Sequence, residues 1–251
     1  MDLTLAYLHA IQQTSGTPLH SAYTFSFMRR GKAAKAEEGT PETQKPVEQP
    51  NPYETSIKTI SSVKTVEEFW STYNFLRRPD DLPTTTDYHF FREGIKPTWE
   101  DSANAKGGKW IIRMPKGLAS RYWEEVILAL IGGQFTGVPE TEICGVVVSI
   151  RHSEDILGIW NKTSSDSGLV ERLRDAIKKV LQLPSFAPME YKPHQSSIQD
   201  RSSFRNTHVW KGKHEGRSDR SGENRRSGSW GEDSRKPRRG GGGGDSARAW
   251  R

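Results

Sequence analysis

The sequence predicts an α+β fold in which three amphipathic helices cover one face of an antiparallel β-sheet. Two observations support this fold class. Segments whose apolar and polar residues alternate, as in a half-buried strand, come in adjacent pairs joined by short connections. Three other segments repeat their apolar residues with the period of a helix, so the expected order is β-β-α-β-β-α-β-β-α-β. Helices on one face leave the other face of the sheet free to bind a ligand.

The N-terminal part begins with a pair of strands and a helix. Residues 22–30 (AYTFSFMRR) alternate aromatic and hydroxyl side chains, which indicates a half-buried strand, and residues 56–64 (SIKTISSVK) predict a weaker one. The tetrapeptide TVEE at 65–68 has the form of a capping box, and apolar residues follow it at helical spacing. We therefore expect the first helix to begin there.

The rest of the chain is expected to contain two further helices and five further strands. The helix at 118–133 carries its apolar residues on one side and ends in two glycines, which is a common stop signal. The helix at 168–183 is followed by a proline, which cannot continue it. The predicted strands are 87–93, 109–114, 144–151, 155–162 and 189–192.

Composition divides the chain into a folded domain and flanking segments. The domain is expected to span residues 17–194. Within it, residues 32–52 are rich in Pro, Glu, Lys and Thr, which predicts a flexible insertion. Residues 195–251 are rich in Ser, Arg and Gly and are expected to form a disordered tail. Residues 1–16 are an N-terminal segment whose order the sequence leaves open.

The net charge of +6 comes from the C-terminal tail. From residue 196 onward there are 14 Lys/Arg and 7 Asp/Glu, whereas the remainder has 23 basic and 24 acidic residues. Charge therefore gives no reason to expect nucleic-acid binding by the domain itself. Basic disordered segments with aromatic residues bind single-stranded RNA weakly, so a weak contact between tail and RNA is one hypothesis. A solvated or phosphorylated tail without an RNA partner is the alternative.

Several classes of protein are excluded by composition. Cys144 is the single cysteine, which excludes an internal disulfide framework and a multi-thiolate metal site. No apolar run approaches the roughly 20 residues that cross a bilayer. No metal-ligand constellation, phosphate loop or nucleophile–base arrangement is legible, so we expect no enzyme, no cofactor and no metal. We expect no membrane association and a reducing location, the cytoplasm or also the nucleus.

Trp99 stands out as a candidate ligand contact because it lies in a polar loop, GIKPTWEDSANAKGG, directly before Glu100. A flat heteroaromatic ligand can stack on the indole ring while the carboxylate accepts two N–H hydrogen bonds from the ligand's edge. Guanine has such an edge, formed by N1–H and the N2 amino group. Trp110 and Trp123, in contrast, occupy positions typical of the core, and Cys144 lies in an apolar strand.

Six blocks follow one another along the chain: TVEEFWSTYN, HFFREGIKPTWED, GGKWIIRM, WEEVILALIG, CGVVVSIR and IWNK. In this order they resemble the translation initiation factor 4E family of mRNA 5′-cap-binding proteins. The resemblance covers about residues 17–194 and is closest to the subgroup of the 4E homologous protein and the novel cap-binding protein. It implies a curved antiparallel sheet with three helices on the convex face and a cap pocket on the concave face, in agreement with the element order above.

The resemblance implies that four residues recognise the 7-methylguanine base. Tyr53 and Trp99 would sandwich the base, Glu100 would accept hydrogen bonds from N1–H and N2, and Trp160 would pack near the methyl group. The alternative for Trp160 is a buried strand residue without a ligand contact. Methylation at N7 gives the purine a positive charge, which each aromatic face attracts by about 1–2 kcal/mol when desolvated. Most family members carry tryptophan where this chain has Tyr53, and tyrosine is the weaker cation–π partner. Moderate cap affinity is therefore expected.

Arg151 and Lys109 match the cations that bind the cap phosphates in the family. Ile156 occupies a position where many members have a phosphate-binding lysine, and the carboxylates Glu154 and Asp155 precede it. The resemblance thus implies weaker phosphate binding than in those members.

A second site is implied on the convex face, where partners of the family dock a helix with a Tyr-x4-Leu-hydrophobic motif. Pro18, Val66, Trp70 and Leu128 match the positions that contact this helix. Successive helix residues point about 100° apart, so Phe69 and Trp70 cannot face the same core and one ring is expected to be exposed. The alternative is that Trp70 only packs the helix onto the sheet.

The sequence therefore predicts a non-enzymatic protein that binds capped mRNA and a partner helix to control translation initiation. The partner would be a scaffold initiation factor or a 4E-binding regulatory protein. The protein would act as an initiation factor or as a repressor that occupies caps, because both roles use the same two surfaces. The alternative from another class is an interaction module with a degraded cap pocket that acts through its convex face, an alternative that Tyr53 and Ile156 keep open.

Overall fold

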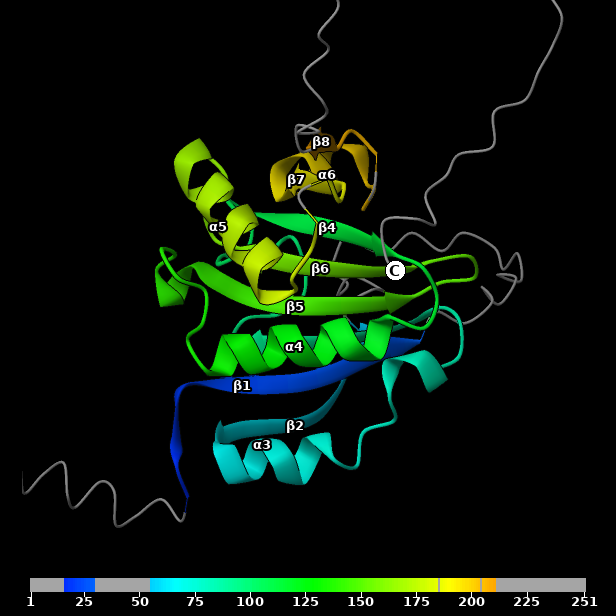
Figure 1. Cartoon of the computed structure of the whole chain (residues 1–251), viewed down its shortest axis with the longest axis vertical. Coiled ribbons are helices and arrows are strands. Elements are labelled where there is room, and N and C mark those ends of the chain that lie inside the picture. The colour runs from blue at the N-terminus through cyan, green and yellow to red at the C-terminus, as the bar shows by residue number, and fades with distance from the viewer. Residues whose placement is uncertain (1–15, 30–54, 185, 204, 211–251) are drawn as a thin grey trace, which may run out of the picture.

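The computed structural model describes residues 16–29, 55–184, 186–203 and 205–210. They contain one curved, eight-stranded antiparallel sheet with the strand order β2-β1-β3-β5-β6-β4-β7-β8 (Figure 1). The strands are β1 (Pro18–Arg29), β2 (Lys58–Thr65), β3 (Thr86–Arg92), β4 (Gly108–Met114), β5 (Ile143–Ile150), β6 (Asp155–Asn161), β7 (Met189–Pro193) and β8 (His208–Trp210). The helices are α3 (Val66–Tyr73), α4 (Ala119–Ile131), α5 (Ser167–Val180) and α6 (His194–Asp200), with single 3₁₀ turns at Pro79–Asp81 and Glu140–Glu142.

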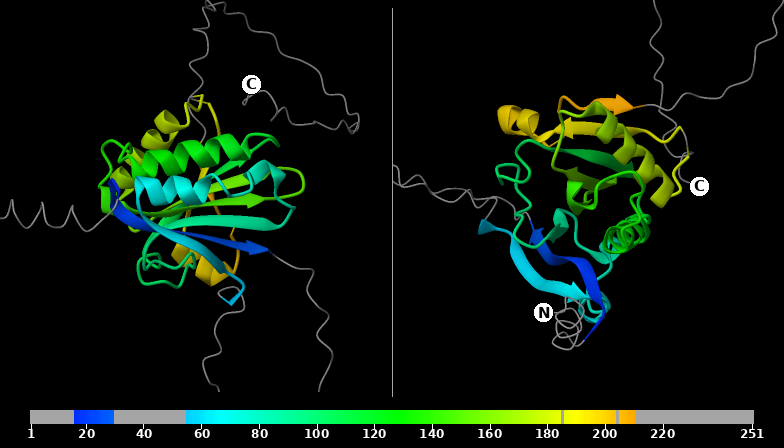
Figure 2. Two further views of the ribbon diagram at one scale, coloured as in Figure 1. Left: turned by 90° about the horizontal axis from the view of Figure 1, so that it is seen from below. Right: turned by 90° about the vertical axis from the view of Figure 1, so that its left-hand side faces the viewer.

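The sheet has a helix-covered face and an open face. Helices α3, α4 and α5 lie on one side of the sheet, and the short helix α6 lies on the other (Figure 2). Strand β4 shows how the sequence produces this difference: Trp110 and Ile112 are buried in the core, whereas Lys109 and Ile111 line a cavity on the opposite face. The predicted α+β fold, with three helices on one face of an antiparallel sheet, is confirmed.

The first helix begins and packs as its sequence predicts. The Thr65 side chain accepts a hydrogen bond from the backbone N–H of Glu68 at 3.2 Å, which caps the helix N-terminus. The Glu68 carboxylate in turn accepts from the backbone N–H of Lys64 at 2.7 Å. Phe69 is 0% exposed and Trp70 is 38% exposed, so the adjacent rings do point to different environments. The convex face therefore carries an exposed indole.

The predicted start of a disordered tail at residue 195 is corrected by the structure. Helix α6 and strand β8 lie within that segment, and β8 pairs with β7 as the eighth strand. The Trp210 ring packs edge-on against Trp110, with centroids 6.5 Å apart, and the Arg174 guanidinium lies 4.7 Å from the Trp210 centroid. A segment too polar to build its own core is thus ordered by surfaces that the sheet and α5 already provide.

Other sequence expectations fall outside the described residues. They concern residues 1–15, the insertion at 32–52, Tyr53 and the tail at 211–251. Within the described ranges, no helix is long and apolar enough to cross a membrane. The same ranges contain no group of three or more His, Cys, Asp or Glu side chains arranged to hold a metal ion.

Candidate functional site

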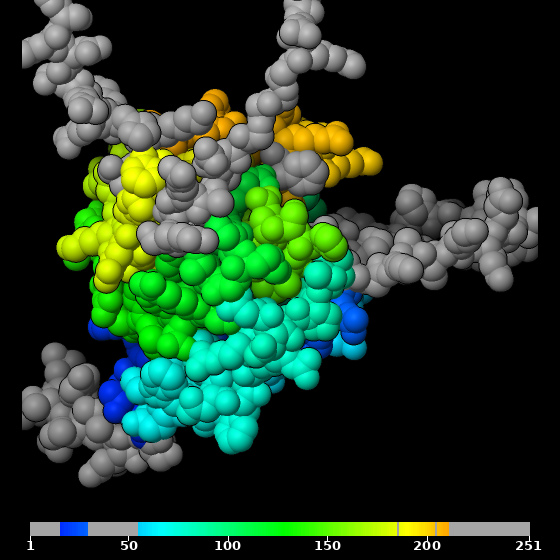
Figure 3. All heavy atoms as spheres, turned by 45° about the vertical axis from the view of Figure 1, so that its right-hand side comes forward, coloured from blue at the N-terminus to red at the C-terminus, as the bar shows by residue number. Residues whose placement is uncertain are grey.

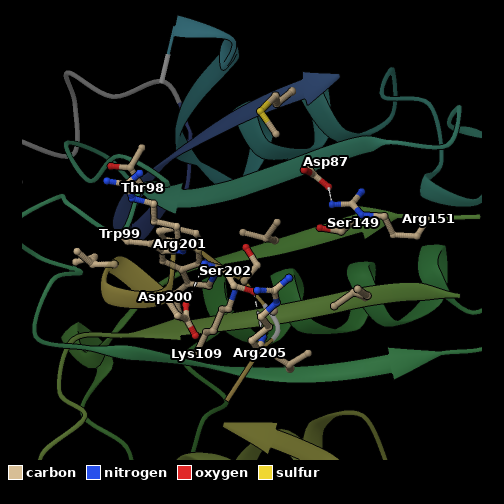
Figure 4. Close-up of a pocket in the computed structure, with 18 of the residues that line it drawn as sticks. Asp87, Thr98, Trp99, Lys109, Ser149, Arg151, Asp200, Arg201, Ser202 and Arg205 are labelled. Atoms are coloured by element: carbon tan, nitrogen blue, oxygen red, sulfur yellow. Dashed lines mark hydrogen bonds and ion pairs between the residues drawn. The ribbon is translucent and has the colours of Figure 1, made fainter. Parts of the chain in front are cut away.

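A cavity of about 1280 Å³ opens on the face of the sheet opposite α3, α4 and α5 (Figure 4). Strands β3, β4, β5 and β6 form its floor, and the loop before β4 and the segment after α6 form its walls. Five sequence-predicted ligand contacts line it. They are Trp99, Glu100, Lys109, Arg151 and Trp160. The structure therefore brings together four parts of the chain: the loop before β4, strand β4, the end of β5 and strand β6.

Trp99 and Glu100 are presented by the loop between β3 and β4. The Asp101 carboxylate accepts hydrogen bonds from two loop N–H groups, at 3.0 and 2.8 Å. The Asn104 amide donates to two loop carbonyl oxygens, at 2.7 and 2.8 Å. These bonds hold a half-buried Trp99 ring and an exposed Glu100 carboxylate at the cavity. Asp101 and Asn104 were not predicted from the sequence, although short polar side chains that bond to nearby backbone are typical of such loops.

Trp160 lies on the cavity floor, and two other rings pack against its indole. Phe91 packs edge-on against it with centroids 5.4 Å apart, and the His194 ring centroid lies 4.2 Å away. Burial, together with the nearby Lys109 ammonium, lowers the pKa of His194 to about 3. The imidazole is therefore neutral at physiological pH and adds no positive charge behind the indole.

Lys109 of β4 approaches both indole rings of the cavity. Its Nζ atom lies 6.0 Å from the Trp99 centroid and 5.6 Å from the Trp160 centroid. Both distances are within the range over which an aromatic face attracts a cation. The two rings are thus arranged around a space that favours positive charge.

Arg151 directly follows β5 and is held by a buried carboxylate. Its guanidinium forms an ion pair of 2.7 Å with Asp87 of β3, which Figure 4 shows as a dashed line. Its backbone N–H donates to Asp155 at 3.2 Å, and Asp155 also pairs with Lys116 at 2.6 Å. These contacts orient Arg151 and offset part of its positive charge.

Ile156 also lies on the cavity floor, and its register partner on β4 is Arg113. Arg113 lines the same cavity and pairs with two carboxylates, Glu154 at 2.6 Å and Glu190 at 2.9 Å. The hydrogen bonds from Arg113, first to Glu190 and then to Glu154, raise its pKa despite partial burial. Arg113 could not be predicted from the sequence, because only strand pairing places it opposite Ile156.

Two further cations line the cavity from the segment after α6. They are Arg201 and Arg205, both labelled in Figure 4. Because this segment was expected to belong to the disordered tail, neither arginine was predicted as a ligand contact. No local pattern marks these two arginines among the many others of the C-terminal region.

The residues predicted for a partner site lie on the opposite, helix-covered side. Pro18 and Trp70 are exposed, and Val66 and Leu128 are half-buried. The backbone N–H of Val66 donates to the carbonyl of Thr17 at 2.9 Å, which places Pro18 beside the start of α3. In the space-filling view of Figure 3, the cyan and green segments that contain α3 and α4 form one continuous surface.

Helices α3 and α4 are joined by a small polar network. The Tyr73 hydroxyl donates to Glu124 at 2.7 Å, and Arg78 donates to the Tyr73 oxygen at 2.7 Å and pairs with Glu124. Burial and the hydrogen bond to Glu124 raise the pKa of Tyr73. Leu128 lies one turn after Glu124, so this network fixes the position of Trp70 relative to Leu128.

Comparison with known proteins identifies the family. Residues 18–209 match the family model described as eukaryotic initiation factor 4E. The chain belongs to the eukaryotic initiation factor 4E family. The matched region extends into β8, in agreement with a folded unit that continues past residue 194.

Relatives and solved structures place the chain within the family. Eukaryotic translation initiation factor NCBP of Oryza sativa subsp. japonica is 52% identical over 155 residues, which are 62% of this chain and 67% of the relative. The NCBP of Arabidopsis thaliana is 50% identical over 155 residues, 62% of this chain and 69% of the relative. The structure of Ascaris suum eIF4E-3 with an m7G cap is 29% identical, with a TM-score of 0.63, and covers 77% of this chain and 97% of that chain.

The expected membership of the 4E family and of its novel cap-binding subgroup is therefore confirmed. The family is one of translation initiation factors, which confirms the expectation that the protein is not an enzyme. The burial expected of Trp110, Trp123 and Cys144 is also confirmed. Burial raises the pKa of the Cys144 thiol to about 12, so it is not a reactive thiolate.

Proposed function

We propose that this protein binds the 7-methylguanosine cap of mRNA in its concave cavity and acts in translation initiation. The observation that carries the proposal is one cavity lined by the Trp99 and Trp160 rings together with the Glu100 carboxylate. The family and the solved cap complexes of its members from Ascaris suum and Caenorhabditis elegans support it. The cavity thus combines aromatic faces for a cationic base with an acceptor for its edge.

The chemistry of the cavity suits a methylated purine. Stacking on Trp99 places the positive charge of 7-methylguanine on an aromatic face, and Glu100 accepts the N1–H and N2 hydrogen bonds. Unmethylated guanine lacks this charge, so the cation–π interaction would make the binding free energy more favourable for the methylated base. Tyr53 remains the predicted second ring of the sandwich. The base would therefore be selected by charge as well as by shape.

The phosphates would meet a mixed electrostatic environment. Arg151, Arg201 and Arg205 supply positive charge at the cavity. Asp87 offsets part of the charge of Arg151, and an isoleucine occupies the position of the family's usual lysine. We therefore expect moderate affinity for the cap, with weaker recognition of the triphosphate than in family members that carry the lysine.

The direct test is retention of the full chain on immobilised m7GTP. We expect elution by free m7GTP and not by the same concentration of GTP. Equal elution by both nucleotides would indicate a general guanine pocket. Absence of retention would instead favour the interaction module with a degraded cap pocket.

We also propose that the convex face binds a partner helix with a Tyr-x4-Leu-hydrophobic motif, from a scaffold factor or a 4E-binding regulator. The exposed Trp70 and the half-buried Val66 and Leu128, all on the helix-covered side, support this assignment. Caenorhabditis elegans eIF4E-3, which is 28% identical with a TM-score of 0.62 over 76% of this chain and 99% of that chain, has been solved with the 4E-binding protein Mextli. Activation or repression of translation would depend on the partner. A cytoplasmic or also nuclear location and weak tail–RNA contact remain predictions.

Glu154→Gln is expected to strengthen m7GTP binding by about two- to fivefold, the range of one partly exposed ion pair. The reason is that the Glu154 carboxylate holds the Arg113 guanidinium at 2.6 Å and would compete with phosphate for it. Calorimetric titration with m7GTP and with the 7-methylguanosine nucleoside measures the effect, which should be absent for the nucleoside. Glu93→Gln, which removes an exposed carboxylate away from the cavity lining, is the matched control. Equal gains in both variants would show that net charge alone is responsible.

A further inference from the structure

Lys192 of β7 is a fully buried lysine outside the site described so far. Its side chain is 0% exposed, and a buried ammonium is costly unless it is paired and hydrogen-bonded. Its register partner on β4 is Lys109, so the two lysines project from the same face of adjacent strands. Like charges opposite each other in a sheet are destabilising, so Lys192 needs a strong acceptor nearby.

Both acceptors of Lys192 come from the segment that follows α6. The ammonium forms an ion pair of 2.6 Å with Asp200 and donates a second hydrogen bond to the backbone carbonyl of Arg205. The bond from Lys192 is also the largest cause that lowers the pKa of Asp200, so this carboxylate is ionised at physiological pH. The buried ammonium of Lys192 thus links strand β7 to both Asp200 and Arg205.

The segment is folded around the same carboxylate. Asp200 also accepts from the backbone N–H of Ser202 at 3.0 Å and from the Asn206 amide at 3.2 Å. The backbone N–H of Arg205 donates to the Ser202 hydroxyl at 3.1 Å. Residues 200–203 and 205–206 therefore belong to one turn, whose hydrogen bonds converge on the partner of Lys192.

This turn is a wall of the concave cavity. Its lining residues include Arg201, Ser202 and Arg205 (Figure 4). Arg201 ends α6 with a φ of 46°, a left-handed conformation that non-glycine residues adopt only at an energetic cost. Other contacts must stabilise the turn in this left-handed conformation. The hydrogen bonds from Lys192 to Asp200 and Arg205 lie on either side of Arg201 to Ser203 and can do this.

We propose that Lys192 is a positioning residue that holds this turn against the sheet and thereby places Arg201 and Arg205 in the cavity wall, where they would meet the cap phosphates. Lys192 does not itself line the cavity. The inference rests on the proposed function, because it names the wall that would meet the cap phosphates. It differs from a purely structural role in one respect: loss of the ammonium should affect the phosphates of a ligand and not its base.

The experiment compares Lys192→Met with the unmodified chain in calorimetric titrations with m7GMP and m7GTP. We expect m7GTP affinity to fall about tenfold, the loss of about one hydrogen bond to a charged group, and m7GMP affinity to change less than about twofold. Limited trypsin digestion is the second measurement. Cleavage after Arg201 and Arg205, identified by peptide mass, should become faster. Lys64→Met, which removes an exposed lysine from an ion pair on β2, is the matched control and should change neither result.

Asp200→Asn covers the case in which Lys192→Met does not fold, because it weakens the same pair from its more exposed side. It should reduce the m7GTP affinity in the same direction, with m7GMP again little changed. Equal losses for m7GMP and m7GTP, or an unchanged m7GTP affinity, would overturn the positioning role. If the unmodified chain does not distinguish m7GTP from GTP, the proposed function fails instead, and the trypsin comparison still tests whether Lys192 holds the turn.

Discussion

Trp99→Ala is expected to abolish specific retention on m7GTP while the domain remains folded. The ring lies in a loop held by Asp101 and Asn104 rather than in the main core, so its loss removes a binding surface and leaves the loop's own hydrogen bonds in place. Removal of a central aromatic contact costs about 2 kcal/mol or more, which corresponds to at least about thirtyfold weaker binding. Calorimetry with m7GTP measures the loss, and thermal unfolding checks the fold.

The neighbouring carboxylate provides a second variant of the same prediction. Glu100→Gln retains the size of the side chain and loses the charge that favours the N1–H and N2 donors. We expect weaker m7GTP binding from this change as well. Wild-type affinity in Trp99→Ala would show that the cavity is not the base-binding site, whatever the result for Glu100.

Trp70→Ala is expected to abolish binding of a peptide with the Tyr-x4-Leu-hydrophobic motif and to leave m7GTP affinity nearly unchanged. The ring is 38% exposed on α3, whereas the cavity lies on the other face of the sheet. Effects at sites this well separated are close to additive. Trp99→Ala and Trp70→Ala are therefore reciprocal controls, since each should eliminate one interaction and preserve the other.

The competing interpretation of Trp70 makes a different prediction. If the ring only packs α3 onto the sheet, its removal should lower the melting temperature strongly and reduce cap binding together with peptide binding. The neighbouring variant Phe69→Ala serves as the reference for the loss of stability when a core ring is removed. This fully buried ring is expected to cost about 3–5 kcal/mol of stability when truncated. A Trp70→Ala variant that resembles Phe69→Ala in thermal unfolding would exclude the partner site.

Features that depend on residues close together in the chain could be predicted from the sequence alone. The capped start of α3 at Thr65, the opposite burial of Phe69 and Trp70, and the buried Trp110 follow from spacings of a few residues. Side-chain direction along a helix or strand is set by local geometry, so these spacings are sufficient. Trp99 could be singled out for a related reason, because a large ring in a polar loop has no local packing role.

Only the tertiary structure determined which distant residues meet. Strand register places Arg113 opposite Ile156 and Lys192 opposite Lys109, and neither pairing has a signal in the intervening sequence. The turn formed by residues 200–203 and 205–206 has too few apolar residues to form a core, and it is ordered by a buried ammonium and by the sheet edge. Its composition matches that of the tail beyond it, so the free energy that folds it comes from surfaces built elsewhere in the chain. Local sequence thus determined the elements and the candidate rings, whereas long-range pairing determined the charges that surround them.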